Sequence, residues 1–450
     1  MKTTSLSKIK FTISFLFAST YFASAQERGL DERINDAFTP VANWWGNLVL
    51  HDFPGTSIPT IILLLVGGAL FFTAYFGFVN IRRFPTAVQI VTGKFDKLDH
   101  NQAGDTELDT EGDIKRIIVD ESKTGEVSHF QALTTAVSGT VGNGNIAGVA
   151  LAIAVGGPGA TFWMILCGLL GMSTKFVECT LGVKYRDIGE DGTVYGGPMY
   201  YLTKGFKERG FEKIGKVLAV IFAILCIGAS FGGGNAAQSN QAAMQLVSLF
   251  DLTGGNARTI IGLIMMVFVG IIIIGGIKRI ASVTEKVVPF MALMYILACL
   301  YIIIGNFSYV DDAFGMIFSQ AFSPQAGLGG LLGVLITGFR RAAFSNEAGA
   351  GSASIAHSAV KTKYAASEGL VALLEPFIDT VVICTMTALV IIIFNGDSSV
   401  FEYGGVGGKV LIDGMEVEGA AITAAAFAKY ISFSGPFLTL AVVLFAVSTM

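Results

Sequence analysis

Long apolar runs, separated by short blocks that hold most of the charged residues, are the feature that most limits how this chain can fold. Of its 450 residues 52% are hydrophobic and only 14% are charged, whereas soluble domains carry about 25% charged residues. Runs of roughly 20 apolar residues can cross a bilayer as helices. The sequence therefore predicts an all-α polytopic membrane protein in a lipid bilayer. Its net charge of −4 gives no indication of nucleic acid as a partner.

The N-terminus has the pattern of a cleaved secretory signal. A lysine-rich start is followed by a short apolar core and an A-x-A motif that ends at residue 25. Some 12 apolar residues are too few to span about 30 Å of hydrocarbon. We therefore expect a signal peptide at 1–25 and an extracytoplasmic segment at 26–57, with an interfacial helix around its paired tryptophans.

Residues 58–450 are expected to form one transmembrane domain, with a cytoplasmic acidic loop at about 93–127. The loops that are cytoplasmic in this orientation hold most of the lysines and arginines, which agrees with the positive-inside rule. Nine spans are expected, at about 58–80, 129–156, 160–183, 216–250, 258–277, 285–306, 313–340, 368–394 and 420–449.

The stretch from Gln131 to Gly157 is apolar, but several glycines and the asparagines Asn143 and Asn145 interrupt it. Each glycine inside a helix costs about 1 kcal/mol relative to alanine. In a bilayer, unwound backbone is tolerated only where it is buried in protein or lines a polar cavity. This pattern predicts a broken transmembrane helix whose opened backbone forms part of a binding site. A glycine-rich helix-packing face is the alternative, and it does not account for the asparagines.

The span at 313–340 carries a second interruption, at Ser323-Pro324 and the glycines that follow. Because five spans separate the starts of the two broken elements, the second enters the membrane from the opposite side. Interrupted helices at corresponding positions of two halves indicate an inverted-repeat transporter. We expect an inverted five-helix repeat with an extra N-terminal helix, the second repeat being cut short at residue 450.

Several separated motifs resemble the sodium:alanine (alanine/glycine:cation) symporter family, and the resemblance covers about 55–450. It implies eleven helices, ten of them in a leucine-transporter-type core, and transport of small amino acids with sodium. The motifs are VSGTVGNGNIAGVALAIAVGGPGATFWM at 137–164, YGGPMYYL at 195–202, GFRRAAFSNEAGAGSASIAHSAVKT at 338–362 and LEPFIDTVVICTMTALV at 374–390.

The resemblance implies a secondary active transporter that imports alanine or glycine by sodium symport and alternating access. It would be a multi-pass protein of the plasma membrane (bacterial inner membrane), with sodium as coupling ion and no cofactor. The chain departs from the family at Ile165, usually a second tryptophan, and at Met172, usually a small residue, which leaves the side-chain size of the substrate open. Proton-coupled transport and an ion channel are the alternatives. The four scattered histidines offer no constellation for an enzyme.

Substrate contacts are expected at the first break and beside it. Backbone N–H groups near Gly142, Asn143 and Gly144 are expected to meet a substrate carboxylate, because glycine lets backbone and ligand approach closely. Gln238 and Asn240 offer amide groups for the substrate amine or for a gate. Internal hydrogen bonding between helices is an equally open interpretation of these two.

Oxygen atoms suited to sodium are expected at the same break. Thr140 and Val141 would contribute carbonyls, and Asn145 a neutral side-chain oxygen. By the resemblance, Ser448 and Thr449 match hydroxyls that supply a second sodium site. Simple hydrogen bonding of this pair to the i−4 carbonyl is the alternative.

Charged residues in apolar runs carry further expectations. Asp379 lies one helical turn after Glu375 and near the middle of its span, so it is a functional candidate: it could bind sodium, carry a proton or pair with a basic residue. Lys175 and Glu178 are expected to neutralise each other as a structural pair. A gate or anchor network is expected from four residues at the cytoplasmic end of the second broken span, namely Arg340, Arg341, Asn346 and Glu347.

Overall fold

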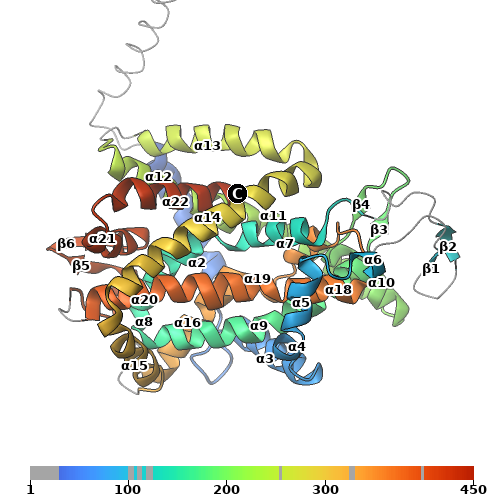
Figure 1. Cartoon of the computed structure of the whole chain (residues 1–450), viewed down its shortest axis with the longest axis horizontal. Helices are drawn as coiled ribbons and strands as arrows, with labels where there is room; N and C mark the ends of the chain where they lie inside the picture. The colour runs from blue at the N-terminus through green and yellow to red at the C-terminus, as the bar shows by residue number, and fades with distance from the viewer. Residues whose placement is uncertain are drawn as a thin grey trace, which may run out of the picture.

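The computed structural model describes residues 30–99, 106–108, 114–117, 125–252, 256–323, 330–396 and 400–450. In this part of the chain the protein is mostly helical, with three small antiparallel hairpins. The predicted signal peptide and Pro324 of the second predicted break lie outside the described residues. Figure 1 shows long helices running side by side along the longest axis, with the hairpins at the two ends of the bundle.

The first half of the described chain runs from the N-terminal helices to the end of α12. Its helices and strands are α2 (Leu30–Val49), α3 (Thr60–Tyr75), α4 (Val79–Arg82), α5 (Phe84–Val91), α6 (Asp96–Asp99), β1 (Thr106–Leu108), β2 (Ile114–Ile117), α7 (His129–Thr140), η2 (Gly144–Gly148), α8 (Val149–Gly156), α9 (Gly159–Lys184), β3 (Asp187–Ile188), β4 (Val194–Tyr195), α10 (Pro198–Glu208), α11 (Glu212–Ala229), η3 (Ser230–Ala236) and α12 (Ala237–Leu249).

The second half carries the remaining helices and the third hairpin. Its elements are α13 (Ala257–Ile273), α14 (Gly276–Gly305), η4 (Phe307–Tyr309), α15 (Val310–Ala321), α16 (Gly330–Asn346), α17 (Ala353–His357), α18 (Ala365–Ala372), α19 (Leu374–Pro376), η5 (Phe377–Cys384), α20 (Thr385–Gly396), η6 (Val406–Gly408), β5 (Val410–Ile412), β6 (Met415–Val417), α21 (Ala420–Tyr430) and α22 (Ser434–Thr449).

Several of these helices are long and apolar enough to cross a membrane. By length and composition, four of the described helices could cross a membrane: Gly159–Lys184, Glu212–Leu249, Gly276–Gly305 and Ala365–Gly396. A fifth candidate is the pair α7 and η2–α8, which bends by 52°. The shorter apolar helices α3, α13 and α22 lie where further spans were predicted. These helices agree with a multi-pass membrane protein.

Two of the nine predicted spans differ from the structure. The span at 420–449 is wrong as a single helix, because extended backbone at Ile431 (φ −126°, ψ 108°) separates α21 from α22. Pro436 lies in the first turn of α22, where its missing N–H costs nothing. The span at 313–340 is described as two separate helices, α15 and α16, and α16 continues to Asn346. These two helices lie on either side of the predicted interruption, whereas the inverted-repeat arrangement of the two halves is not confirmed.

Helix α9 lies at the centre of the bundle and packs against α3, α15, α16, α17 and α18. Glycines allow the closest approaches. A Cβ atom on Gly338 of α16 would lie 2.5 Å from the carbonyl oxygen of Ala160, and one on Gly369 of α18 would lie 1.9 Å from Thr180 Oγ1. Small residues at crossing points let helix backbones pack closely inside a membrane.

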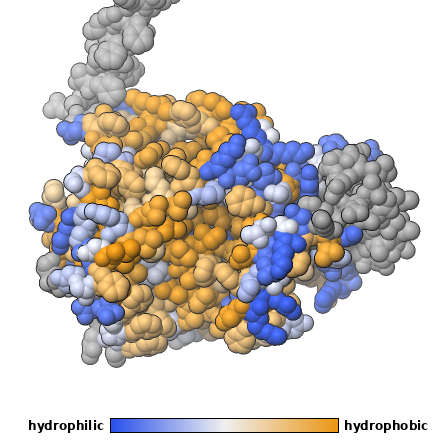
Figure 2. Space-filling model, viewed as in Figure 1, coloured by the Kyte–Doolittle hydropathy of each residue, from blue (hydrophilic) through white to orange (hydrophobic). Residues whose placement is uncertain are grey.

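The outer surface is apolar over much of its area. Figure 2 shows hydrophobic residues across the middle of the molecule and hydrophilic ones towards its two ends. Exposed side chains in this apolar region include Ile224 of α11 (64% exposed) and Phe268 of α13 (62% exposed). Because monomeric soluble proteins rarely expose apolar patches of more than a few hundred Å², this surface is suited to contact with lipid tails.

At one end of the bundle, the segment before α7 is fastened to the segment after α17. Val127 and Val360 form a parallel bridge, in which the N–H of Lys361 donates to the Val127 carbonyl at 2.8 Å. The N–H of Glu126 donates to the Ala359 carbonyl at 2.7 Å. These bonds join the start of α7 directly to the connection between α17 and α18, and we call them the α7–α17 clamp.

Candidate functional site

The predicted break in the first glycine-rich stretch is confirmed. Helix α7 begins with a capping box at Ser128 and ends at Thr140, and the chain resumes as the π-helical segment η2 after a 52° bend. At the bend, Val141 has non-helical backbone angles (φ −76°, ψ 89°). The backbone around Val141 and Gly142 therefore leaves the regular helical hydrogen-bond ladder, and it is buried in the protein as membrane physics requires.

Three π-helical segments border the break or the second cavity beside it. Besides η2 they are η3, which contains the glycine run of the long span Glu212–Leu249, and η5, which lies inside the span Ala365–Gly396. π-Bulges are rare in proteins, and many of those that occur lie at functional sites. The sequence predicted the irregular backbone of η2 and marked the glycines of η3, but η5 was missed because it contains no glycine.

Asn145 of η2 contacts Asp379 of η5. Its Nδ2 donates to the Asp379 carboxylate at 2.6 Å and to the Asp379 carbonyl at 3.1 Å, while its Oδ1 accepts the Gly142 N–H at 2.9 Å. Hydroxyl groups of Ser345 and Thr380 complete the surroundings of the carboxylate, at 3.1 and 2.6 Å. Two predicted ion-binding residues, far apart in sequence, are thus brought together in the core.

The predicted substrate-binding residues also lie together. Gln238 of α12 reaches the break, where its Oε1 accepts the Asn143 N–H at 2.9 Å and its carbonyl accepts from Asn143 Nδ2 at 3.3 Å. Side-chain oxygens therefore occupy the N–H groups of Gly142 and Asn143, which were expected to meet a carboxylate. Asn240, two residues further along α12, is exposed, and its Nδ2 is 3.8 Å from Met244 Sδ.

Two cavities adjoin the break. The first, of about 340 Å³, is lined among others by Asn143, Gly148, Asn240 and Arg341. The second, of about 630 Å³, lies against η3 and α16. Both are lined in part by Gly144, Gln238 and Phe344, so these three residues lie between the two cavities. Volumes of this size are in the range of small-molecule sites, roughly 300–1,000 Å³.

The predicted sodium ligands fall into two groups. Thr449 Oγ1 lies 3.5 Å from the Val141 carbonyl oxygen, and it also donates to the Phe445 carbonyl at 2.9 Å. Ser448 does not join this group: its hydroxyl is 3.4 Å from Met291 Sδ and bonds back to its own helix. The Thr140 hydroxyl donates back to carbonyl oxygens of the preceding turn of α7, at 3.4 Å. The second group is the contact of Asn145 with Asp379.

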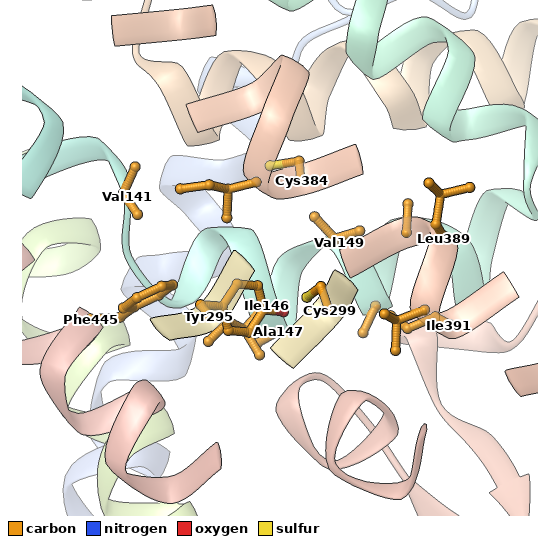
Figure 3. Packing of buried hydrophobic residues seen from close by; sticks show 14 of the residues in the cluster. Val141, Ile146, Ala147, Val149, Tyr295, Cys299, Cys384, Leu389, Ile391 and Phe445 are labelled. Atoms are coloured by element: carbon orange, nitrogen blue, oxygen red, sulfur yellow. The ribbon is translucent and has the colours of Figure 1, made fainter. Parts of the chain in front are cut away.

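An apolar shell packs against the far side of the break. Figure 3 shows Val141, Ile146 and Val149 beside Tyr295 of α14 and Phe445 of α22. The Tyr295 hydroxyl and Thr387 Oγ1 are 2.7 Å apart, so a polar atom within this shell is paired. The break therefore has a tightly packed apolar side and a side that faces the cavities.

A line of buried charges runs from α9 to the start of α7. Lys175 Nζ pairs with Glu375 at 3.0 Å, and Glu375 lies 3.8 Å from His357 Nε2. Glu368 accepts from Nδ1 of both His357 and His129. We call these five residues the ionic cluster. The expected pair of Lys175 with its neighbour on the same helix is wrong, because Glu178 instead accepts the N–H of Gly349 at 2.6 Å.

The pKa of His357 reflects its place in the ionic cluster. Burial by itself lowers this pKa, but the carboxylates of Glu368 and Glu375 outweigh burial and raise it from 6.5 to about 9. Lys175 and His129 are the other charged or titratable members of the cluster. His357 is thus held as a cation at neutral pH, and its charge is matched within the protein.

The residues of the expected gate or anchor network, Arg340, Arg341, Asn346 and Glu347, do not form one cluster, because the side chains at the end of α16 point to different places. Arg340 is exposed, whereas Arg341 lines the first cavity. Asn346 Nδ2 donates to Thr380 Oγ1 at 2.9 Å, and Glu347 accepts from the hydroxyl of a nearby serine. The sequence did not predict that Arg341 lies beside the break, because only the fold brings α16 against η2.

Comparison with known proteins agrees with the geometry. Residues 47–450 match the model of the sodium:alanine symporter family. The chain is 40% identical over 393 residues to the sodium/alanine symporter AgcS of Methanococcus maripaludis, which covers 87% of this chain and 78% of that protein. It is 32% identical over 388 residues to a Bacillus subtilis protein named as probable sodium/glutamine symporter GlnT, and the matched region covers 86% of this chain and 70% of that protein. It is also 40% identical over 288 residues to a putative sodium/proton-dependent alanine carrier protein YrbD of the same species, and this match covers 63% of this chain and 57% of that protein.

Proposed function

Because this chain belongs to the sodium:alanine symporter family, we propose that it imports a small neutral amino acid, alanine or glycine, together with sodium by alternating access. The observation that carries this proposal is the bend between α7 and η2, where opened backbone and the amide groups of Asn143 and Gln238 border two cavities. Broken helices that border a central cavity are the binding sites of secondary transporters.

The substrate occupies the first cavity, against Asn143, Gly144 and Gln238. Gln238 and Phe344 border both cavities, so a shift of these two side chains would open the substrate to one cavity and close it from the other. The Gln238 amide oxygen now accepts a backbone N–H of the break, and a bound ligand competes for that donor. This exchange links substrate binding to the partition between the cavities.

Sodium binds beside the same break. The Val141 carbonyl and the Thr449 hydroxyl offer neutral oxygens 3.5 Å apart, and the Asp379 carboxylate, which accepts from Asn145 Nδ2 at 2.6 Å, offers a second group of oxygens. Unwound backbone carbonyls are the usual sodium ligands in transporters of this kind. Because Val141 and Asn145 flank the residues that contact substrate, an ion held there orders the backbone that binds the amino acid. That is the physical basis of coupling.

The arrangement in the membrane follows the sequence. The transporter domain is 58–450, the mature N-terminus is extracytoplasmic, and the protein lies in the plasma membrane, with the loop at 93–127 in the cytoplasm. An inverted five-helix repeat relates the two halves of the chain, and the family resemblance and the confirmed first break support it.

Uptake by purified protein in liposomes tests this function. Labelled alanine, glycine and glutamine are offered with an inward sodium gradient, with a pH gradient alone, and with neither. We expect saturable accumulation of alanine or glycine that requires sodium. In Asn145→Ala it is lost, while Asn306→Ala, which changes an asparagine at the end of α14, retains it. Accumulation driven by the pH gradient without sodium would favour proton coupling, and conductance without accumulation would indicate a channel.

A further inference from the structure

The guanidinium of Arg341 is seated on two glycines of the broken helix. A Cβ atom at Gly148 would lie 2.0 Å from Arg341 Cζ, and one at Gly144 would lie 3.1 Å from Nη2. These glycines are four residues apart in η2 and have ordinary helical backbone angles around them, so a turn does not explain their presence. Any larger side chain at 148 would displace the guanidinium. The break is therefore shaped to receive this charge.

Arg341 has no direct ion-pair partner in the part of the chain that the structure describes, and the nearby Asp379 acts on it only through space. Within the described residues it forms no ion pair and no hydrogen bond, and its Nε is buried without a partner. Its guanidinium also lies over the ring of Phe344, whose centroid is 4.6 Å from Cζ. A guanidinium has five N–H donors, and this half-buried one, which lines an open cavity, keeps donors unused that a charged acceptor would bind strongly. Since Arg341 faces the first cavity, an anionic group that enters this cavity would meet its unused donors.

The cavity also holds an acceptor suited to a cationic group. Asn143 Oδ1 is buried without a hydrogen-bond partner and belongs to the same cavity wall. An unmet acceptor and an unmet guanidinium in one cavity complement a zwitterion, the charged form of a free amino acid. The backbone N–H groups of Gly142 and Asn143 are already occupied, so the strongest donor left for a carboxylate is Arg341.

We propose that Arg341 binds the α-carboxylate of the transported amino acid, by a two-point guanidinium–carboxylate contact, and so selects substrates that carry a free carboxylate. This inference rests on the proposed function and adds to it the residue that recognises the substrate's negative end. Paired N–H donors in a fixed fork match a carboxylate in both charge and shape. Phe344, stacked on the guanidinium, holds the fork in place from the side shared with the second cavity.

Competition between alanine and alaninamide tests the inference, since alaninamide keeps the amine and lacks the carboxylate. Binding of labelled alanine to purified protein in sodium is measured for the wild type, Arg341→Gln, Arg341→Lys and the control Arg340→Gln, which removes the same charge at an exposed position. We expect alaninamide to compete about 10- to 100-fold more weakly than alanine in the wild type and in Arg340→Gln. In Arg341→Gln the two competitors become equal within a few-fold, and Arg341→Lys is intermediate.

Two results would overturn the proposal. The first is an Arg341→Gln variant that melts at the same temperature as Arg340→Gln and still prefers alanine to alaninamide as strongly as the wild type. Arg341 would then not bind the carboxylate. Unchanged discrimination with faster loss of accumulated alanine would assign Arg341 instead to a gate, with Glu418 in the same cavity wall as its partner. If Arg341→Gln does not fold, the ratio of alanine to alaninamide competition in Arg341→Lys tests the proposal instead, and a ratio equal to that of the wild type would contradict it. A wild type without sodium-stimulated uptake overturns the proposed function, whereas a working symporter that discriminates without Arg341 overturns this inference alone.

Discussion

Two groups of charged side chains inside this protein differ in how their charges are balanced. In the ionic cluster, Lys175 and His357 lie against the carboxylates of Glu375 and Glu368. At the first cavity, Arg341 has an aromatic ring on one side and forms no ion pair with any described carboxylate, although Glu418 lines the same cavity. Both groups occupy the interior of the same bundle, yet one is closed upon itself and the other is open.

The difference separates a structural role from a binding role. A matched set of buried charges holds helices in register, because removing one member leaves its partner unpaired. An unmatched charge beside a cavity stabilises nothing in the empty protein and gains its partner when a ligand arrives. Variants in the ionic cluster should therefore change stability first, and variants around Arg341 should change transport first.

The largest effect is expected from Lys175→Met. It leaves the Glu375 carboxylate buried without its cation, so the free energy of unfolding should fall by about 3–5 kcal/mol. Adding Glu375→Gln should restore most of this loss. Thermal unfolding in detergent is the measurement, and Lys216→Met is the control, because its pair with Glu212 is exposed and worth at most about 1 kcal/mol. Equal losses for Lys175→Met and Lys216→Met would contradict the structural role.

A pH effect of similar origin is expected from His357. Its pKa is raised from 6.5 to about 9 in the folded protein, so the stabilisation is fully present below pH 6.5 and is lost as the pH rises through 9. A shift of this size corresponds to up to about 3 kcal/mol. His357→Gln should flatten the melting profile between pH 6.5 and 9.5. The exposed His51→Gln should leave it as in the wild type, and a profile still as steep in His357→Gln would count against the cluster.

A smaller, purely functional effect is expected from Gly148→Ala. The added methyl group meets the Arg341 guanidinium, with the Cβ atom 2.0 Å from Cζ, so uptake should fall about 10- to 100-fold while the melting temperature changes little. The matched control is Gly139→Ala in α7, where a Cβ atom has nothing within 4 Å. Initial uptake rates in liposomes give the comparison. Normal uptake by Gly148→Ala would show that the position of the guanidinium does not matter.

The smallest effect is expected at the neutral oxygens. Thr449→Val keeps the shape of the side chain and removes the hydroxyl beside the Val141 carbonyl. The sodium concentration for half-maximal uptake should rise about 3- to 10-fold. Ser448→Ala, at the next residue, should leave it unchanged because that hydroxyl faces α14. A shift in Ser448→Ala alone would exchange the two assignments.

Much of the fold could be predicted from the sequence. The span expected at 160–183 is α9, Gly159–Lys184, because the length and apolarity of a run report directly on burial in a membrane. The division between α21 and α22 was missed, since both pieces are apolar and only Gly435-Pro436 marks the start of the second helix. The π-helical form of η5 left no mark in composition either.

The site was predictable where backbone chemistry creates it, and not where distant helices do. Glycines and asparagines in one apolar run indicated the break and the position of Asn143 and Asn145 within it. The partner of Lys175 could not be found from spacing, because a residue 200 positions later lies closer than its neighbour one turn away. In the same way, the small residues of η2 indicated free space but not that Arg341 fills it.

The α7–α17 clamp has a mechanical consequence. Because backbone bonds tie the start of α7 to the segment after α17, α7 and that segment move as one rigid lever. On the other side of the bend, η2 is attached to η5 through the bond from Asn145 to Asp379. Any rocking of one part against the other must then be absorbed by the few residues between the two attachments. Those residues are Val141 to Asn143, so under the proposed function an ion or an amino acid bound to them would fix the angle between the two parts.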